Sequence, residues 1–427
     1  MVYFNMNFLG KFFKKKNRLF SQDELFLSLD IGTEVAKGLL FKITDLGITI
    51  VASYYVNQPF KAMQAGRVLD VDLVYSTANQ VIDGLFKEIN KVRIPNIKTI
   101  FGIAGELING ISVNAYINRM HVSNKLITEK EESIILTNLF DQIIVDGKQE
   151  LANILGVAIN QVVVLNVSVN SFFLDGVFTS KIIGKTGSRI SANLYASFAP
   201  LSVIKNLAEI TKKLRINLSG IVVQPYAVAR SFKDVLADPN FSGIFIDIGG
   251  GTTDIALVTE GGAIQTQMFA FGGRGFTQKI AKEFNLSYQL AEQRKIQYSS
   301  GTLPPDLTRK TREVLREDAR LWVDASRIAM QKFENVEKFP ATIYLCGGGA
   351  MLPDIQDTIT SYPWSNFLPF EKHPNVILAT PNKQDKVIDT TGKLRYPYDV
   401  TPIALARYFY DIINKPKYNY VGFNYED

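Results

Sequence analysis

The sequence contains few of the residues that form disulfides and metal centres. Cys346 is the single cysteine, and His121 and His373 are the two histidines. One cysteine cannot form an intramolecular disulfide or a Cys/His zinc cluster, and two histidines exclude a multi-histidine metal site. So few histidines also argue against a Ser-His-Asp triad. We therefore expect a protein of the reducing cytoplasm.

The sequence also lacks a long hydrophobic stretch. No run of 18 or more apolar residues is present, which disfavours a transmembrane helix. Hydrophobic residues make up 46% and charged residues 21% of the 427 residues, a balance that is typical of globular proteins and not of disordered chains. A chain of this length is expected to contain about two to four compact units.

Positive charge is concentrated at the N-terminus. The net charge is +6, from 47 basic and 41 acidic residues. Five of the basic residues lie within residues 1–22, which contain no acidic residue. Without those five, 42 basic residues stand against 41 acidic ones, so the rest of the chain is nearly neutral. A nucleic-acid-binding surface needs basic residues spread over a folded face, and we therefore expect no nucleic-acid partner.

The N-terminal segment has the pattern of a helix that lies on a membrane surface. Phe4, Phe8 and Phe12 recur every four residues, and the lysines between and after them can contact lipid headgroups. Gly10 weakens such a helix by about 1 kcal/mol relative to alanine. The alternatives are an unstructured basic leader, or an apolar face that packs on the protein's own body or on a partner. Because phenylalanines are unfavourable in water, we predict that residues 1–22 bind a membrane surface.

A β-β-β-α pattern occurs twice. The expected elements are strands at 25–31, 38–44 and 48–56, a helix at 73–92 and a strand at 99–104, and then strands at 243–248, 254–259 and 263–271 with a helix at 276–284. Both units open with a strand that ends in Asp-Ile-Gly, at Asp30 and at Asp247. A duplicated unit predicts two similar lobes that face each other across a cleft.

Two stretches lie outside the duplicated pattern. Residues 106–198 predict a small inserted α+β subdomain, with a helix that begins near Thr128. Residues 288–335 are charged and helical and predict a second insert. Its possible buried residues are Trp322, Ile328 and Phe333. Near the C-terminus we expect a helix over 402–413 and then an irregular tail.

The segment Asp247–Asp254 has the composition of a phosphate-binding turn between two strands. Three glycines, Gly249, Gly250 and Gly251, let the backbone approach a ligand closely, and the Thr252 and Thr253 hydroxyls add donors. Asp247, at the end of a strand, is placed to hold a hydrated Mg²⁺ that bridges two phosphates. The alternative is a glycine-rich hairpin with no ligand. The aspartates on both sides of the glycines favour the phosphate site.

Two further segments complete the predicted site. The first-lobe hairpin offers Asp30 to the same cation, with Gly32 and Thr33 in the turn and Lys37 returning toward the phosphates. In the second segment, an apolar strand runs into Gly347, Gly348, Gly349, Ala350 and Met351, and Pro353 then opens a helix. Glycines at such a junction admit a flat ring or a sugar–phosphate edge, and a helix N-terminus favours negative charge. Neither a Walker A loop nor a Rossmann fingerprint is present.

Together these motifs resemble the actin-like ATPase superfamily. Its two phosphate motifs match residues 30–37 and 247–254, and its adenosine motif matches residues 347–353. Residues 224–229 resemble the family's connecting segment, in which a residue at the position of Gln224 orients the attacking water. The resemblance implies an α/β fold of the actin-like, duplicated ribonuclease H-like type with two lobes, and ATP and Mg²⁺ as cofactors.

Within this superfamily the chain resembles the FtsA family of bacterial cell-division proteins over about residues 25–413. The insert at 106–198 stands where FtsA proteins carry an extra subdomain, and Glu292 and Lys295 match part of a nucleotide-facing pattern. The resemblance implies a scaffold that forms filaments and links FtsZ-like or other divisome proteins to the inner face of the membrane. FtsA proteins carry a membrane helix at the C-terminus, whereas the basic segment here is N-terminal. That arrangement resembles PilM proteins of type IV pilus assembly, which usually have a degenerate second phosphate motif.

The resemblance gives the chain an order of parts. These are the basic segment 1–22, lobe I at 23–105 and 199–242, the inserted subdomain 106–198, lobe II core at 243–275 and 339–400, a helical insert at 276–338, a C-terminal helix at 401–414 and a tail at 415–427.

Since the side-chain amide of Gln224 is a poor general base, we expect slow or negligible ATP hydrolysis. The competing functions are an ATPase whose purpose is hydrolysis and an adaptor that has lost nucleotide binding. A sugar kinase would need a second-substrate pocket with an aspartate base, for which the sequence offers no candidate.

Overall fold

The two copies of the β-β-β-α unit form two mixed sheets with the same strand order and the same strand directions. The computed structural model describes residues 23–119, 123–232, 238 and 240–422, so the predicted membrane segment, residues 1–22, lies outside the described residues. The first sheet runs β11 (Asn217–Val223), β6 (Lys98–Ile103), β1 (Phe26–Ile31), β2 (Val35–Thr44), β3 (Gly47–Asn57) and β17 (Val387–Asp389). The second runs β16 (Asn375–Leu378), β15 (Thr342–Cys346), β12 (Gly243–Ile248), β13 (Thr253–Val258) and β14 (Ile264–Phe269).

The duplication extends to the register of the opening hairpins. Asp30 of β1 pairs with Lys37 of β2, and Asp247 of β12 pairs with Asp254 of β13. In both sheets the central strand is antiparallel to the next strand and parallel to the strand on its other side. The two similar lobes predicted from the repeated Asp-Ile-Gly are therefore confirmed.

Helices pack on both sheets and join them. The helices of lobe I are α2 (Val71–Glu88) and α4 (Leu201–Leu214), and those of lobe II are α6 (Gly273–Glu283), α7 (Tyr288–Ser299), α8 (Pro305–Met330) and α9 (Pro353–Ser361). Two more helices pack against each other between the sheets, α5 (Gln224–Phe232) and α10 (Val400–Asn414). The helix α5 leads from lobe I to lobe II. The chain returns to the first sheet at β17, and α10 then packs against that sheet.

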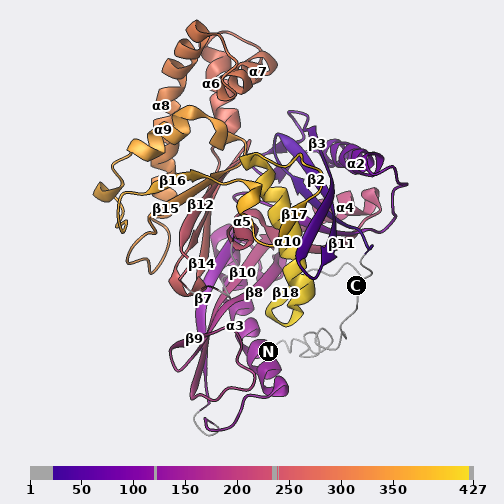
Figure 1. Ribbon diagram of the computed structural model, residues 1–427, viewed down its shortest axis with the longest axis vertical. Helices are drawn as coiled ribbons and strands as arrows, with labels where there is room; N and C mark the ends of the chain where they lie inside the picture. Colours follow the sequence, from indigo (N-terminus) through magenta and orange to yellow (C-terminus); the bar gives the residue numbers. More distant parts are fainter. Residues whose placement is uncertain (1–22, 120–122, 233–237, 239, 423–427) are drawn as a thin grey trace.

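The inserted segment has a sheet and a core of its own. Its strands are β7 (Asn109–Asn118), β8 (Val162–Leu174), β9 (Val177–Thr179) and β10 (Arg189–Pro200), and its helix is α3 (Glu129–Leu155), capped by the Thr128 hydroxyl. The apolar side chains between α3 and this sheet form a separate buried cluster. The insert lies at one end of the molecule and α6–α8 lie at the opposite end (Figure 1).

Three predictions about the later part of the chain are wrong. The tail is not wholly irregular, because residues 416–418 form a short 3-10 helix, η8, and β18 (Asn419–Val421) pairs with β8 of the insert. Residues 387–389 do not stay in lobe II, because β17 joins β3 of the first sheet. Ile328 is 51% exposed, whereas Trp322 and Phe333 are buried. From Trp322 the buried face of α8 runs through Ser326, Ala329 and Met330, and Ile328 lies between these positions.

Two short strands, β4 (Met63–Gln64) and β5 (Arg67–Val68), form a small hairpin next to the predicted first phosphate motif.

Among the described residues, none of the helices combines the length and the hydrophobicity that are needed to span a bilayer.

Candidate functional site

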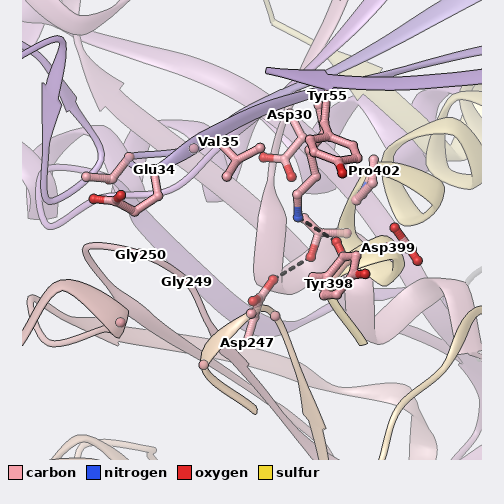
Figure 2. A pocket seen from close by; sticks show the side chains of 18 of the residues that line it. Asp30, Glu34, Val35, Tyr55, Asp247, Gly249, Gly250, Tyr398, Asp399 and Pro402 are labelled. Carbon is pink, nitrogen blue, oxygen red and sulfur yellow. Dashed lines mark hydrogen bonds between the residues drawn. The ribbon is translucent and has the colours of Figure 1, made fainter. Parts of the chain in front are cut away.

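A cavity of about 580 Å³ lies between the two lobes, where the Asp-Ile-Gly hairpins face each other. Its size is within the range of small-molecule sites. All but two of the predicted site residues line it. These lining residues are Asp30, Gly32, Thr33, Lys37, Gln224, Asp247, Gly249, Gly250, Gly251, Thr252, Glu292, Lys295, Gly347, Gly348, Gly349 and Met351. The fold thus brings together five segments that are far apart in the sequence. Figure 2 shows Asp30 and Glu34 of the first hairpin facing Asp247 of the second.

Thr253 and Ala350, which the sequence also predicts as ligand-binding residues, do not line this cavity. The Thr253 hydroxyl donates to the carbonyl of Phe271 at 2.6 Å and accepts from the Trp322 indole at 2.8 Å. It is therefore a buried structural contact. Ala350 is also completely buried.

In the first lobe, Asp30 is buried and accepts a hydrogen bond from Gln224. It is buried at the end of β1, and Nε2 of Gln224 donates to its Oδ1 at 2.7 Å. Burial raises the pKa of Asp30 to about 6, although the charge of Lys37 opposes the rise. Lys37 lines the cavity, and its Nζ donates to the carbonyl of Tyr398 at 2.5 Å. The amide nitrogen of Gln224 therefore contacts an aspartate in this structure.

Asp247 and Asp254 are the matching pair in the second lobe. Both are buried, and burial raises the pKa of each carboxyl above its usual value. Asp247 accepts a hydrogen bond from the Thr401 hydroxyl, and Asp254 accepts one from Thr252 at 3.2 Å. Within the described part of the chain, Oδ1 of Asp254 has no hydrogen-bond partner, and no group of three or more His, Cys, Asp or Glu side chains is arranged to hold a metal ion.

The glycines of the second hairpin are required by its contact with the first. A Cβ on Gly250 would lie 2.3 Å from Cγ of Glu34, and a Cβ on Gly251 would lie 2.8 Å from Oγ1 of Thr33. A larger residue at either position would push the two hairpins apart. The triple glycine therefore permits a direct lobe-to-lobe contact as well as access to the cavity.

Arg274 and Tyr288 tie the two lobes together beside these hairpins. Arg274, in the first turn of α6, pairs with Glu34 and donates to the carbonyls of Met63 at 2.8 Å and Thr33 at 3.0 Å. The Tyr288 hydroxyl also donates to Glu34, at 3.1 Å. Charge-assisted bonds of this kind are stronger than neutral ones, so they favour the closed arrangement of the lobes.

Glu292 and Lys295 lie together on α7, at the lobe II side of the cavity. Nζ of Lys295 contacts Oε2 of Glu292 at 2.8 Å and donates to Oγ1 of Thr277 at 2.8 Å and to the carbonyl of Gly273 at 3.0 Å. These bonds fix both side chains against the start of α6. Both residues line the cavity, as do Gly347, Gly348, Gly349 and Met351.

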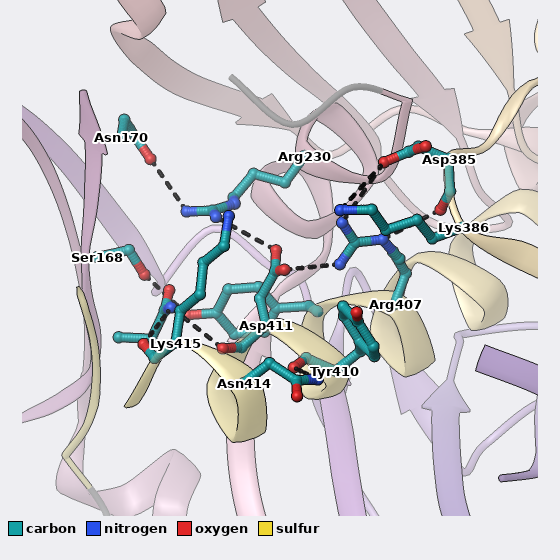
Figure 3. A network of polar contacts seen from close by, with 12 residues as sticks. Ser168, Asn170, Arg230, Asp385, Lys386, Arg407, Tyr410, Asp411, Asn414 and Lys415 are labelled. Carbon is teal, nitrogen blue, oxygen red and sulfur yellow. Dashed lines mark hydrogen bonds and ion pairs between the residues drawn. The ribbon is translucent and has the colours of Figure 1, made fainter. Parts of the chain in front are cut away.

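A buried polar network connects α5 and α10 with the insert (Figure 3). Asp411 of α10 contacts Nη2 of Arg230 at 3.2 Å and Nη1 of Arg407 at 2.7 Å. Arg230 also donates to Oδ1 of Asn170, which lies in β8 of the insert, at 3.3 Å. Since Gln224 opens the same helix as Arg230, one rigid helix joins the cavity to the insert.

Sequence reasoning missed Thr401, Tyr398 and Arg274. Each contacts a predicted motif residue from a distant part of the chain, and none belongs to a recognisable motif. Thr401 directly precedes the helix predicted over 402–413. That position next to a helix start is the sequence feature that could have drawn attention to it. Glu34 and Asp254 also line the cavity. Both lie inside the predicted phosphate motifs, so they could have been predicted as site residues from the sequence.

The geometry can be compared with known proteins. A family model described as "Cell division protein FtsA" matches residues 244–395, which include the triple-glycine hairpin and the segment 347–353. The FtsA of Buchnera aphidicola (strain Bp) is 24% identical over 399 residues, which cover 84% of this chain and 91% of that protein. The predicted resemblance to FtsA is confirmed.

A second FtsA relative and one solved structure extend this comparison. The FtsA of Bacillus subtilis (strain 168) is 25% identical over 296 residues, which cover 65% of this chain and 58% of that protein. The structure titled "PilM-PilN type IV pilus biogenesis complex" has a TM-score of 0.60 and 17% identity, and the match covers 90% of this chain and 98% of that chain. At 17% identity, the match to the PilM structure shows a shared actin-like fold and nothing more. The FtsA-like chain therefore has relatives named for cell division and a structural neighbour named for pilus assembly.

Proposed function

We propose that this FtsA-like chain is an ATP- and Mg²⁺-dependent scaffold of cell division. The observation that carries the proposal is the cavity between the lobes. One aspartate from each lobe, Asp30 or Asp247, and residues of both hairpins line it. Asp254, whose Oδ1 has no hydrogen-bond partner among the described residues, and Lys37 line the same cavity. A site with carboxylates, a lysine and exposed backbone fits a nucleotide with its cation.

The residues divide into three groups by what they would hold. The hairpin backbones at Gly32–Thr33 and Gly249–Thr252, with Lys37, would hold the phosphates. Asp30 and Asp247 would orient a hydrated Mg²⁺, which commonly keeps several waters and takes one or two carboxylates. Residues 347–351, together with Glu292 and Lys295, would hold the nucleoside. When bound, the cation would neutralise phosphate charge that two buried carboxylates alone would repel.

The proposed action is a change in lobe closure. A nucleotide held by both hairpins binds the closed arrangement more tightly than an open one, and its differential affinity therefore shifts the population toward closure. The Arg274–Glu34 contact would close in the same movement. Because Gln224 supplies an amide, which is a poor general base, hydrolysis would be slow or negligible. Gln224 would orient the attacking water in whatever turnover occurs.

The division role is supported by the family match and the FtsA relatives, and the insert is the proposed interaction module. Lobe closure would control self-association into filaments and the binding of FtsZ-like or other divisome proteins. The 17% identity to the PilM chain supports only the shared fold, so a pilus role has less support.

Replacing Asp247 with asparagine should abolish the Mg²⁺-dependent part of nucleotide binding. The amide keeps the size of the side chain and removes the charge that holds the cation. In a thermal-shift experiment, a non-hydrolysable ATP analogue with Mg²⁺ should raise the Tm of the wild type and leave that of Asp247→Asn nearly unchanged. Asp83→Asn is the matched control, because Asp83 is exposed on α2 and should retain the full shift. Equal shifts in the wild type and in Asp247→Asn would refute the cleft assignment.

Membrane attachment through residues 1–22 is a separate part of the proposal, and it places the protein on the cytoplasmic face of the membrane. The full chain should co-sediment with anionic liposomes and lose this binding when residues 1–22 are deleted. Replacement of Phe4, Phe8 and Phe12 with serine keeps every lysine and should reduce binding strongly, since buried apolar area contributes most of the affinity. Binding that persists after the deletion would move the anchor to another part of the chain.

A further inference from the structure

Thr401 contacts the candidate cation ligand of the other lobe. It is the second residue of α10 and is buried, and its hydroxyl donates to Oδ2 of Asp247 near the end of β12. The two residues are 154 positions apart in the sequence. The contact therefore exists only because the start of α10 lies beside the cavity.

The other oxygen of Asp247 is confined as well. Gly347 has a φ of +81°, and a Cβ on it would lie 2.2 Å from Oδ1 of Asp247. The amide of Gly347 in turn donates to the carbonyl of Pro397 at 3.1 Å, within the short 3-10 helix η7 (Pro397–Asp399) that precedes α10. Asp247 is thus enclosed by the segment 397–401 on one side and by Gly347 on the other.

The first lobe has an equivalent arrangement. Gln224 is the first residue of α5, and it donates to Asp30 in the same way that Thr401 donates to Asp247. Asp30 and Asp247 occupy the same position in the two sheets, since each ends the central strand of its opening hairpin. Each of the two helices between the sheets therefore has, within its first two residues, a side chain that donates to one of the two aspartates.

We propose that Thr401 is a positioning residue for Asp247 and is the second-lobe counterpart of Gln224. This inference rests on the proposed function, because it assigns Thr401 to the Mg²⁺ that accompanies the nucleotide. The Thr401 hydroxyl occupies Oδ2 of Asp247, and Asp247 lines the cavity. Side chains that hold a metal ligand in place commonly change metal affinity by about 10- to 100-fold when they are removed.

The test compares Thr401→Val with Thr401→Ser. Valine keeps the shape of threonine and removes the hydroxyl, whereas serine keeps the hydroxyl and removes the methyl group. By isothermal titration calorimetry, Thr401→Val should bind the non-hydrolysable ATP analogue in Mg²⁺ about 10- to 100-fold more weakly than the wild type. In EDTA its affinity should remain within about 3-fold of the wild type, and Thr401→Ser should restore the Mg²⁺-dependent affinity to within the same factor.

The possible outcomes separate this inference from the proposed function. A wild-type protein whose nucleotide affinity does not respond to Mg²⁺ contradicts the proposed function. A wild type that responds to Mg²⁺ together with an unchanged Thr401→Val contradicts the role of Thr401. An equal loss in Mg²⁺ and in EDTA also contradicts it, because that result indicates a general structural effect. If Thr401→Val does not fold, Thr401→Ala is measured under the same two conditions and is judged by the same criteria.

Discussion

Truncation of Asp411 to alanine should lower the free energy of unfolding by about 3 to 5 kcal/mol. The Asp411 carboxylate contacts Nη2 of Arg230 at 3.2 Å and Nη1 of Arg407 at 2.7 Å. All three side chains are buried. Removal of the carboxylate leaves two guanidinium groups with less compensating charge away from water, and the resulting desolvation penalty is larger than the net value of the ion pairs themselves.

Chemical denaturation with and without the substitution measures this effect. Asn414→Ala is the matched control, because Asn414 is an exposed residue of the same helix, and it should change stability by less than about 0.5 kcal/mol. Asp411→Asn should fall between the two, since the amide retains an acceptor but carries no charge. If Asp411→Ala destabilises no more than Asn414→Ala, the network in Figure 3 does not hold α5 against α10.

Replacement of Asp30 with asparagine should stabilise the ligand-free protein while it destroys Mg²⁺-dependent nucleotide binding. Burial raises the pKa of Asp30 from 3.8 to about 6, so the ionised carboxylate destabilises the folded state near neutral pH. Since one pKa unit corresponds to about 1.4 kcal/mol, the asparagine variant should gain about 3 kcal/mol at pH 7. Asparagine keeps an oxygen that can accept the hydrogen bond from Gln224.

The pH dependence gives the sign of this effect independently. The folded state binds the Asp30 proton more tightly than the unfolded state, and the Asp30 contribution to stability therefore falls as pH rises from about 4 to about 6. The difference in unfolding free energy between Asp30→Asn and the wild type should thus be large at pH 7.5 and small at pH 4. Because Asp247 and Asp254 are present in both proteins, taking the difference removes most of their contribution. A difference that is constant with pH would contradict the assignment of an elevated pKa to Asp30.

The sequence predicted the parts of the site that lie within a few residues of each other. Asp30 and Lys37 belong to one hairpin, and Asp247 and the three glycines belong to another. In both cases the strand patterns on either side fix the turn. The same local reasoning predicted that α3 begins near Thr128, which is its N-cap, and that α9 begins at Pro353.

Local reasoning failed where a distant partner decides the structure. Ile328 is the more apolar side chain, yet the packing of α8 places Ser326 and Ala329 on the buried face instead. Asn419 and its neighbours have little strand pattern of their own, but the open edge of β8 pairs with them. Thr253 looked like a phosphate ligand, but its hydroxyl bonds to Phe271 and Trp322.

The sequence by itself determined the duplicated architecture, the position of the two aspartates at equivalent strand ends and the likeness to FtsA, because these depend on patterns that repeat along the chain. Only the tertiary structure decided which side chains orient those aspartates and which residues join the lobes. The bond from Thr401 to Asp247 and the ion pair from Arg274 to Glu34 span 154 and 240 residues. Contacts at such separations depend on how two sheets and two crossing helices pack, and no local pattern encodes that packing.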